Sequence, residues 1–472
     1  MSEVGIFVDF GSTFTKVVAM DIDHEEVIGA GKSPSTVKTD ITVGLSHALD
    51  QLQLPDGQTA KGSNIRLACS SAAGGLRLVV IGLVPSLSMN AGRLSALGAG
   101  AKLIGAYSYK LNQSEINDIE RLSPDIVLLV GGTDGGNEEV IIHNAKVLAS
   151  SNLDTPVVVA GNKSCADHVK RLLESGSRHV AVVDNVLGEL DKLNVEPSRR
   201  AIREIFMERI IRAKGLDKAN HFIDGIIMPT PMAVLKAAEL MSQGHGDEEG
   251  LGELMVVDIG GATTDIHSVA KGDPKNHEVM KRGIPEPFAK RTVEGDLGIR
   301  YNALSILEDA GLEHVASSIC YRGSSAELER RIRYLTEHTE YVPSDEPDRL
   351  LDAGLARAAT EIAVERHAGR LEEVYSPHGA MYVQLGKDLT EVKHVIGTGG
   401  IFAYGQNAFP ILEGALFSAQ RPFSLKPKSP DFLIDRSYIL FAVGLLGEQA
   451  PRAALRIGKK YLNKQLVYGA FG

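Results

Sequence analysis

Two stretches that lie far apart in the chain repeat one pattern: an apolar run, an aspartate, a glycine turn with hydroxyl side chains, and a second apolar run. The first stretch is Ile6–Val17 and the second is Met255–Ile266. Each is typical of a β-hairpin whose turn can place backbone N–H groups and hydroxyls against a phosphate. One copy alone would also suit an ordinary hairpin with a polar turn. Two copies favour two lobes whose turns close on one nucleotide from opposite sides.

Each hairpin offers a carboxylate followed by groups that suit a phosphate. Asp9 and Asp258 end the first strand of their hairpins, where the side chain points toward whatever occupies the turn. Glycine in the turn adopts positive φ without steric cost. The candidate phosphate contacts are Gly11, Ser12, Thr13, Thr15 and Lys16 in the first hairpin, and Gly260, Gly261, Thr263 and Thr264 in the second.

A third glycine turn follows the expected strand Val392–Ile396, and a helix can begin after it. A strand, a glycine turn and a helix bring the backbone close to a flat ligand or a phosphate, because no Cβ stands in the way. In isolation the same pattern suits a plain βα turn equally well. The residues of this turn are Gly397, Thr398, Gly399 and Gly400.

Between the two hairpins the pattern changes to apolar strands that alternate with helices, which is typical of a parallel sheet covered on both faces. We expect a separate α/β module with a core of its own over residues 64–190. Its segment Gly131–Gly136 could bind a nucleotide or form a tight βα turn, and the lack of a G-x-G-x-x-G match favours the turn. The expected strands of the module are Ile65–Ala68, Leu76–Leu83, Asp125–Val130, Pro156–Ala160 and His179–Asp184.

The composition limits the partners of this chain. Its formal net charge is −10, and no basic stretch is interleaved with aromatic residues, so we expect no nucleic-acid partner. No apolar run reaches the ~18 residues of a membrane-spanning helix, and the first residues do not have the pattern of a signal peptide. The three cysteines are scattered and match neither a disulfide framework nor a CxxC metal site. We therefore expect a cytoplasmic protein with no membrane partner.

The order of the motifs resembles the superfamily of actin, sugar kinases and heat-shock chaperone ATPases. The motifs are the Asp9 hairpin, a helix entered through Pro229–Pro231, the Asp258 hairpin, the glycine turn from Gly397, and a helix over Asp435–Leu446 with small residues. In that superfamily the matching elements are phosphate loop one, connecting helix one, phosphate loop two, the adenosine loop and connecting helix two. The resemblance implies an α/β, two-lobed actin-like fold with ribonuclease H-like lobes, an inserted module, and ATP and Mg²⁺ in the cleft.

This resemblance divides the chain and gives roles to its hairpin residues. Asp9 and Asp258 would face each other and contact the hydrated Mg²⁺ or the attacking water, since Mg²⁺ prefers hard oxygen ligands. The turn groups would donate to the phosphates with help from Lys16, and Gly397, Gly399 and Gly400 would line the adenosine. The expected bounds are 1–63 and 191–250 for the first lobe with its connecting helix, 64–190 for the module, and 251–472 for the second lobe with connecting helix two.

Within the superfamily, D-x-G-S-T-x-T-K from Asp9 resembles activators and reactivators of radical enzymes. The combination of GGTDGGN, VDIGGATTD, RTVEGDLG and GTGG most closely resembles the glutamate mutase accessory family, called MutL or GlmL, over essentially the whole chain. That resemblance implies an ATP-hydrolysing chaperone that reactivates an adenosylcobalamin-dependent mutase and contacts its subunits.

Two other classes share parts of this pattern. A small-molecule kinase would use the same cleft, but it needs a carboxylate base that we cannot place from the sequence. An iron–sulfur activator shares the first motif, but it needs cysteines that bridge a cluster, and the cysteines here are scattered. The identity of the client mutase, the role of the module and the oligomeric state, including a homodimer, stay open.

Overall fold

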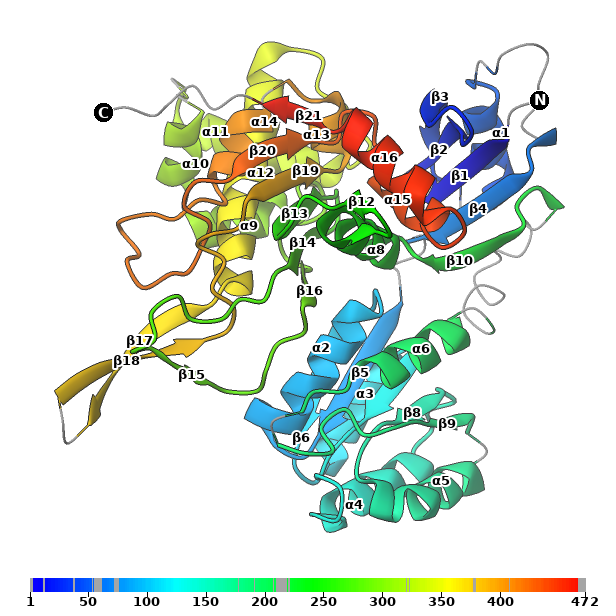
Figure 1. The fold of residues 1–472 in the computed structure, drawn as a ribbon, viewed down its shortest axis with the longest axis vertical. Helices are drawn as coiled ribbons and strands as arrows, with labels where there is room; N and C mark the ends of the chain where they lie inside the picture. Colours follow the sequence, from blue (N-terminus) through cyan, green and yellow to red (C-terminus); the bar gives the residue numbers. More distant parts are fainter. Residues whose placement is uncertain are drawn as a thin grey trace.

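The computed structural model arranges the chain as two lobes, an inserted module and a projecting arm, all of α/β character (Figure 1). No helix in the described part of the chain combines the length and the apolar character that crossing a membrane requires. The described residues are 3–11, 13–36, 39–52, 54, 62–71, 76–176, 178–190, 192–206, 208, 219, 221–319, 321, 323–376, 379–406 and 408–465.

The first lobe is built on a five-stranded sheet with the order β10-β4-β1-β2-β3. β1, β2 and β3 are antiparallel neighbours, whereas β4 runs parallel to β1 and β10 runs parallel to β4. β1 is buried along its whole length, which explains its nearly continuous apolar sequence. The elements are β1 (Val4–Phe10), β2 (Phe14–Asp21), β3 (Glu26–Pro34), β4 (Ile65–Ser70), β10 (Gly225–Pro229) and helix α1 (Ile41–Leu49), which contacts β2 and β3.

The second lobe repeats this topology. Its strands β13, β14 and β16 are antiparallel neighbours, β19 runs parallel to β13, and β20 runs parallel to β19. The order β16-β14-β13-β19-β20 therefore matches that of the first lobe, with β21 added at the edge. This repeat confirms the predicted actin-like fold of two ribonuclease H-like lobes. The strands are β13 (Leu254–Ile259), β14 (Thr264–Val269), β16 (Ala289–Glu294), β19 (His394–Thr398), β20 (Asp431–Ile434) and β21 (Asn463–Gln465).

Two helices pack against each other between the lobes, where the connecting helices were predicted (Figure 1). α8 (Thr230–Gln243) follows β10, and α15 (Leu440–Leu446) follows β20. α15 begins at Leu440, later than the predicted Asp435. The Asp435 carboxylate accepts hydrogen bonds from the backbone N–H groups of Ile439 (2.8 Å) and Leu440 (3.1 Å) at the start of the helix. α16 (Pro451–Tyr461) packs on both.

The remaining helices of the second lobe surround α12, a long helix that covers the outer face of the second sheet. A short hairpin, β11 (Gly244–His245) and β12 (Glu248–Glu249), lies between α8 and the second lobe. The helices are α9 (Ala303–Ala310), α10 (Leu312–Ser318), α11 (Ser325–Glu337), α12 (Glu346–His367), α13 (Gly400–Tyr404) and α14 (Ala408–Glu413).

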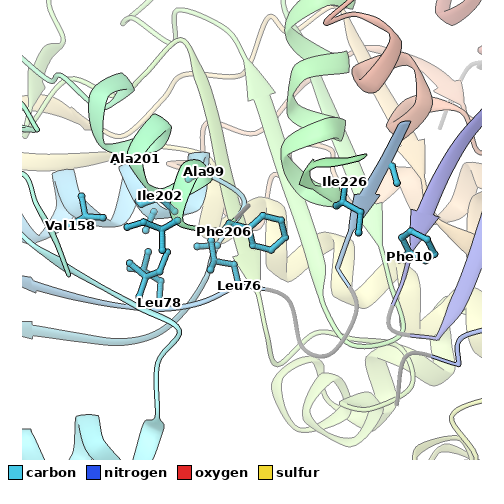
Figure 2. Packing of buried hydrophobic residues seen from close by; sticks show 14 of the residues in the cluster. Phe10, Leu76, Leu78, Ala99, Val158, Ala201, Ile202, Phe206 and Ile226 are labelled. Atoms are coloured by element: carbon cyan, nitrogen blue, oxygen red, sulfur yellow. The ribbon is translucent and has the colours of Figure 1, made fainter. Parts of the chain in front are cut away.

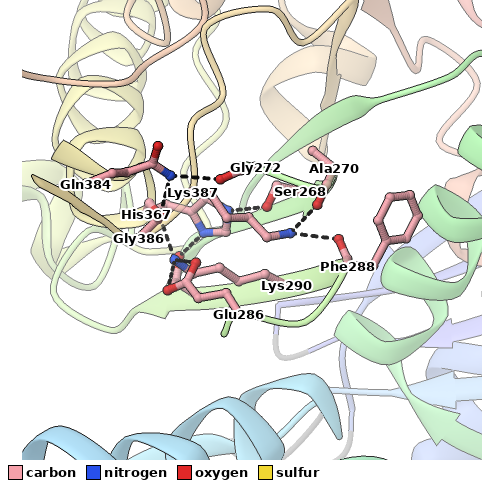
Figure 3. Close-up of polar contacts among 11 residues, drawn as sticks. Ser268, Ala270, Gly272, Glu286, Phe288, Lys290, His367, Gln384, Gly386 and Lys387 are labelled. Carbon is pink, nitrogen blue, oxygen red and sulfur yellow. Dashed lines mark hydrogen bonds and ion pairs between the residues drawn. The ribbon is translucent and has the colours of Figure 1, made fainter. Parts of the chain in front are cut away.

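A three-stranded arm projects from the second lobe (Figure 1), and a buried polar cluster lies at its base (Figure 3). The fully buried Lys387 donates from Nζ to the carbonyl oxygens of Ala270 (2.8 Å) and Phe288 (2.7 Å). Burial lowers the pKa of Lys387 to about 7. Beside it, Lys290 Nζ donates to the Glu286 carboxylate at 2.9 Å. The arm strands are β15 (Met280–Arg282), β17 (Arg370–Ser376) and β18 (Gly379–Leu385).

The inserted module is an all-parallel sheet with the order β6-β5-β7-β8-β9, which agrees with its predicted βα pattern. Its strands are β5 (Arg77–Gly82), β6 (Lys102–Ser108), β7 (Ile126–Leu129), β8 (Val157–Val159) and β9 (Val180–Val182). Its helices are α2 (Asn90–Gly98), α3 (Gln113–Leu122), α4 (Glu139–Ala149), α5 (Ala166–Ser175) and α6 (Glu196–Ile205), with short turns η4 (Pro85–Met89) and η5 (Lys163–Cys165).

One strand was assigned to the wrong sheet. Ile65–Ala68, expected at the start of the module, lies in β4, which pairs with β1 and β10 in the first lobe. The first module strand is therefore β5. A buried parallel strand has the same apolar sequence pattern in either sheet. The pattern therefore does not show which strands it pairs with. The predicted end of the module at residue 190 was also too early, because α6 packs on α2 and β8 of the module.

The module does not have a core wholly of its own, contrary to the expectation from its sequence pattern. One face is packed internally around residues such as Val79 and Ile119. The opposite face shares one hydrophobic cluster with the first lobe, in which Leu78 and Ile202 of the module and Phe10 of β1 are members (Figure 2). The module is thus a part of the first lobe's core as well as an insertion.

Candidate functional site

The two predicted hairpins have the same local geometry. In the first, the Gly11 N–H donates to the Phe14 carbonyl oxygen at 3.1 Å, and in the second the Gly260 N–H donates to the Thr263 carbonyl oxygen at 2.9 Å. Asp9 pairs with Lys16 across the first hairpin, and Asp258 pairs with Asp265 across the second. Because cross-strand partners share a face, each aspartate stands beside a second charged group.

The tips of both hairpins line one cavity of about 370 Å³ between the lobes. They come close to each other, since a Cβ built on Gly261 would lie 3.5 Å from Thr13 Oγ1. Of the predicted site residues, Asp9, Gly11, Thr13, Lys16, Asp258, Gly260, Gly261, Thr263, Gly399 and Gly400 line this cavity. Other parts of its wall come from Thr230 at the start of α8, from Lys102 of the module, and from Asp352 of α12.

Asp9 is buried and held by groups from three elements and from the loop before α15. Its carboxylate accepts hydrogen bonds from Thr230 Oγ1 (2.7 Å) and Tyr438 Oη (3.2 Å), and Lys16 Nζ lies 3.4 Å away. Cys69 Sγ of β4 is 3.8 Å from the same carboxylate. Lys16 Nζ also lies 3.8 Å from the centre of the Tyr438 ring, where a cation is favoured. These contacts fix the direction in which Asp9 faces the cavity.

Asp258 is in a different electrostatic setting. Its pKa is raised to about 7, first by burial and then by the negative charges of Asp265 and Asp9, while Lys16 and Arg291 act in the opposite direction. Asp265 itself is neutralised by Arg291, with N···O distances of 2.8 Å from Nε and 2.5 Å from Nη2. The charged form of Asp258 is therefore disfavoured by burial and by the neighbouring negative charges, and a cation bound beside it would stabilise that form.

This donor set fits a hydrated Mg²⁺. Among the described residues, no group of three or more His, Cys, Asp or Glu side chains is arranged to hold a metal. Mg²⁺ commonly keeps several waters and is held by one or two carboxylates together with substrate phosphates, which matches Asp9 and Asp258. Gly399 packs closely against the end of β13, since its φ is +102° and a Cβ there would lie 2.3 Å from the Ile259 carbonyl oxygen and 3.1 Å from Asp258 Oδ1.

Four predicted residues do not line the cavity. Thr15 is buried on the opposite face of β2, and Thr264 Oγ1 donates to the Leu297 carbonyl oxygen at 2.7 Å. Thr398 Oγ1 donates to Asp435 at 2.9 Å, and a Cβ on Gly397 would meet the Phe402 ring. These positions support the strands behind the site. Ser12 lies outside the described residues.

The glycine-rich segment of the module forms the tight βα turn that its sequence favoured. Gly131, Gly132 and Gly135 have positive φ. The Gly135 N–H donates to Asn162 Oδ1 (3.1 Å), and Asn162 Nδ2 donates to the Gly136 carbonyl oxygen (3.2 Å). None of the described residues that line the cavity comes from this segment.

Several cavity residues were not found from the sequence. Thr230 and Asp265 lie in motifs that were recognised, in the PTP helix entry and at the end of GGATTD, and their polar side chains were a usable signal. Arg291 begins the quoted motif RTVEGDLG, but no role was assigned to it from the sequence. Tyr438 and Lys102 gave no such signal, because they reach the cavity only through tertiary packing.

Comparison with known proteins identifies the family. A model described as MutL protein matches residues 5–462 of this chain. The chain belongs to the MutL protein family. Protein MutL of Clostridium tetanomorphum is 46% identical over 463 residues, which cover 97% of this chain and 99% of that protein. The family indicated by the motifs is thereby confirmed.

Solved structures resemble this chain only distantly. Xylulose kinase from Bifidobacterium adolescentis is 11% identical with a TM-score of 0.32, and the match covers 98% of this chain and 94% of the kinase. The ethanolamine utilization protein EutJ from Carboxydothermus hydrogenoformans is 11% identical with a TM-score of 0.23, covering 96% of this chain and 89% of EutJ. The fold assignment rests on the repeated sheet topology and not on these matches.

Proposed function

We propose that this protein binds ATP with Mg²⁺ between its lobes and hydrolyses it, and that it serves as a reactivating accessory protein of an adenosylcobalamin-dependent mutase such as glutamate mutase. The proposal of ATP binding is supported by the pair of equivalent hairpins, whose aspartates, Asp9 and Asp258, line one cavity. Membership of the MutL protein family supports the accessory role.

The chain's own residues supply positioning and charge. The backbone N–H group of Gly261 and the hydroxyl of Thr13 would donate to phosphate oxygens. Bound Mg²⁺ would neutralise charge that develops on the transferred phosphoryl group. Asp9, fixed by Thr230, Tyr438 and Lys16, would accept a hydrogen bond from the water that attacks, and so orient it.

Hydrolysis could drive reactivation through lobe closure. Both lobes contribute groups to the cavity, so a bound triphosphate favours the closed arrangement over the open one. The connecting helices α8 and α15 pack closely between the lobes and would move with them. This motion would change the surface that the protein presents to a bound client enzyme.

Two experiments test these proposals separately. For the nucleotide, Asp258→Asn should lower ATP turnover by about 100-fold, the scale of losing one transition-state contact. Wild-type turnover in that variant would refute the site. For the role, a mutase inactivated by turnover should recover only with this protein, ATP, Mg²⁺ and fresh cofactor together, and should not recover with Asp258→Asn. If a small molecule is phosphorylated faster than ATP is hydrolysed, a kinase activity replaces the accessory role.

A further inference from the structure

Lys102, the first residue of β6, brings the inserted module into the cavity between the lobes. Its backbone N–H donates to the Leu76 carbonyl oxygen at 2.7 Å, which fixes the start of the strand at the cavity wall. Leu76 and Gly100 of the module line the same wall. The module follows β4 in the chain and belongs to neither hairpin, so it contributes a separate part of the cavity wall.

The ammonium group of Lys102 lies beside Gly295, in the segment that follows β16. A Cβ built on Gly295 would be 3.2 Å from Lys102 Cε and 3.5 Å from its Nζ. Gly295 is tied to that tip, because Asn302 Nδ2 donates both to the Gly295 carbonyl oxygen and to that of Ala262, each at 2.9 Å. Glu294, its neighbour, pairs with Thr264 at the base of the turn.

Lys102 differs from the other cations of the cavity wall in having no partner there. Lys16, Arg291 and Arg300 each pair with a carboxylate, at 3.4 Å, 2.5 Å and 2.6 Å. Lys32 lies 3.5 Å from the centre of the Tyr404 ring. Within the described part of the chain, neither a hydrogen bond nor an ion pair engages Lys102 Nζ. A cation in that position is available to an anion in the cavity.

The segment before Lys102 is clamped by the second lobe. Arg291 Nη1 of β16 donates to the carbonyl oxygens of Leu97 (2.9 Å) and Ala101 (3.0 Å), between α2 and β6. The same guanidinium holds Asp265 in the second hairpin. A cation at the end of a helix such as α2 is also favoured by the helix dipole. The position of Lys102 therefore depends on contact between the module and the second lobe.

We propose that Lys102 contacts the terminal phosphate of a nucleoside triphosphate held by the second hairpin, so that the module completes the site when the lobes are closed. Lysine is a compact charge with three donors, which suits the most highly charged end of the nucleotide. A diphosphate lacks this group and makes no such contact. Lys102 thus distinguishes triphosphate from diphosphate. This assignment rests on the proposed nucleotide function.

The test compares Lys102→Met, which keeps the apolar stem, with the wild type by calorimetric titration with Mg²⁺ and either a non-hydrolysable ATP analogue or ADP. Lys110→Ala is the control, since Lys110 is on the same module but its ammonium pairs with Glu139 at the surface. We expect Lys102→Met to weaken binding of the ATP analogue by about 10- to 100-fold, as for a lost charged hydrogen bond, and to leave ADP binding and the melting temperature unchanged.

Two results would count against the proposal. Unchanged affinity for the ATP analogue would exclude the contact, and an equal loss for both nucleotides would exclude discrimination at the terminal phosphate. Lys102→Ala serves as a second variant, and it should reproduce the selective loss. If the wild type binds neither nucleotide, the proposed nucleotide function itself fails, before any variant is compared.

Discussion

Gly444 sets how closely the connecting helices α8 and α15 approach each other, and Gly444→Ala is therefore a sharp test of their packing. A Cβ on Gly444 would lie 1.9 Å from the Ala233 carbonyl oxygen, 2.7 Å from its carbonyl carbon and 3.1 Å from its Cα. Ordinary contact begins at 3.4 Å, so the helices would have to separate by about 1.5 Å. The obstructing atoms are backbone atoms, which cannot rotate away as a side chain can.

The expected cost follows from two opposing effects. Overpacking a buried contact costs about 1–3 kcal/mol or more, while alanine in place of glycine inside a helix returns about 1 kcal/mol. Because the clash is with backbone, we expect a net loss of about 2 kcal/mol. For a domain of 150–250 residues this lowers Tm by about 4–8 °C.

Scanning calorimetry of the wild type and two variants measures this effect. Gly447→Ala is the matched control: it stands three residues further along the same chain segment, with φ of −58°. Its Cβ would lie 3.1 Å from the Val443 carbonyl oxygen and 3.2 Å from the Leu240 side chain, which requires a shift of only a few tenths of an ångström. It should melt within a degree or so of the wild type. A Gly444→Ala variant that melts with the wild type, or a Gly447→Ala variant that falls as far, would refute the close-packing explanation.

Three further predictions concern the module and the arm. Arg291→Met should leave Asp265 buried without its partner, a change that costs about 3–5 kcal/mol, and amide exchange over residues 90–102 should become faster; unchanged exchange would argue against the clamp. Lys387 has a pKa of about 7 in the folded state against an ordinary value of 10.5. Between these two pH values the folded state binds fewer protons than the unfolded state, so the free energy of unfolding rises with pH. Lys387→Met should remove this contribution to the rise, as measured by urea unfolding at pH 7 and pH 10. Replacing residues 77–205 by a short linker should leave the first lobe unable to fold, because its core is shared, and a soluble deletion with a cooperative melt would contradict this.

The hairpins could be predicted because their chemistry is local. Aspartate at a strand end and glycine in the turn are fixed by neighbouring residues, and Asp9 and Asp258 both line one cavity. Thr15 and Thr264 were misjudged through strand alternation. Each pairs across its hairpin with an apolar residue, Phe10 or Ile259 respectively, and therefore faces away from the aspartates.

What could not be predicted depends on contacts between distant segments. Tyr438 reaches Asp9 across more than four hundred residues of chain, with a sequence separation of 429. Lys102 reaches the second hairpin only because the module packs against β16. The assignment of β4 to the first lobe also depends on its partners. Apolar patterns predict that such an element exists and whether it is a helix or a strand. Which elements it packs against depends on the tertiary structure.

The position of the module between β4 and β10 has a consequence for how the chain is made. β10 begins at Gly225, whereas its neighbour β4 ends at Ser70. During synthesis, one edge of β4 therefore has no partner until the whole module has been produced. An unpaired apolar strand edge is a site for mispairing and aggregation. The nascent first lobe is thus exposed for as long as the ribosome takes to translate the module, which makes the translation time of the module a determinant of yield.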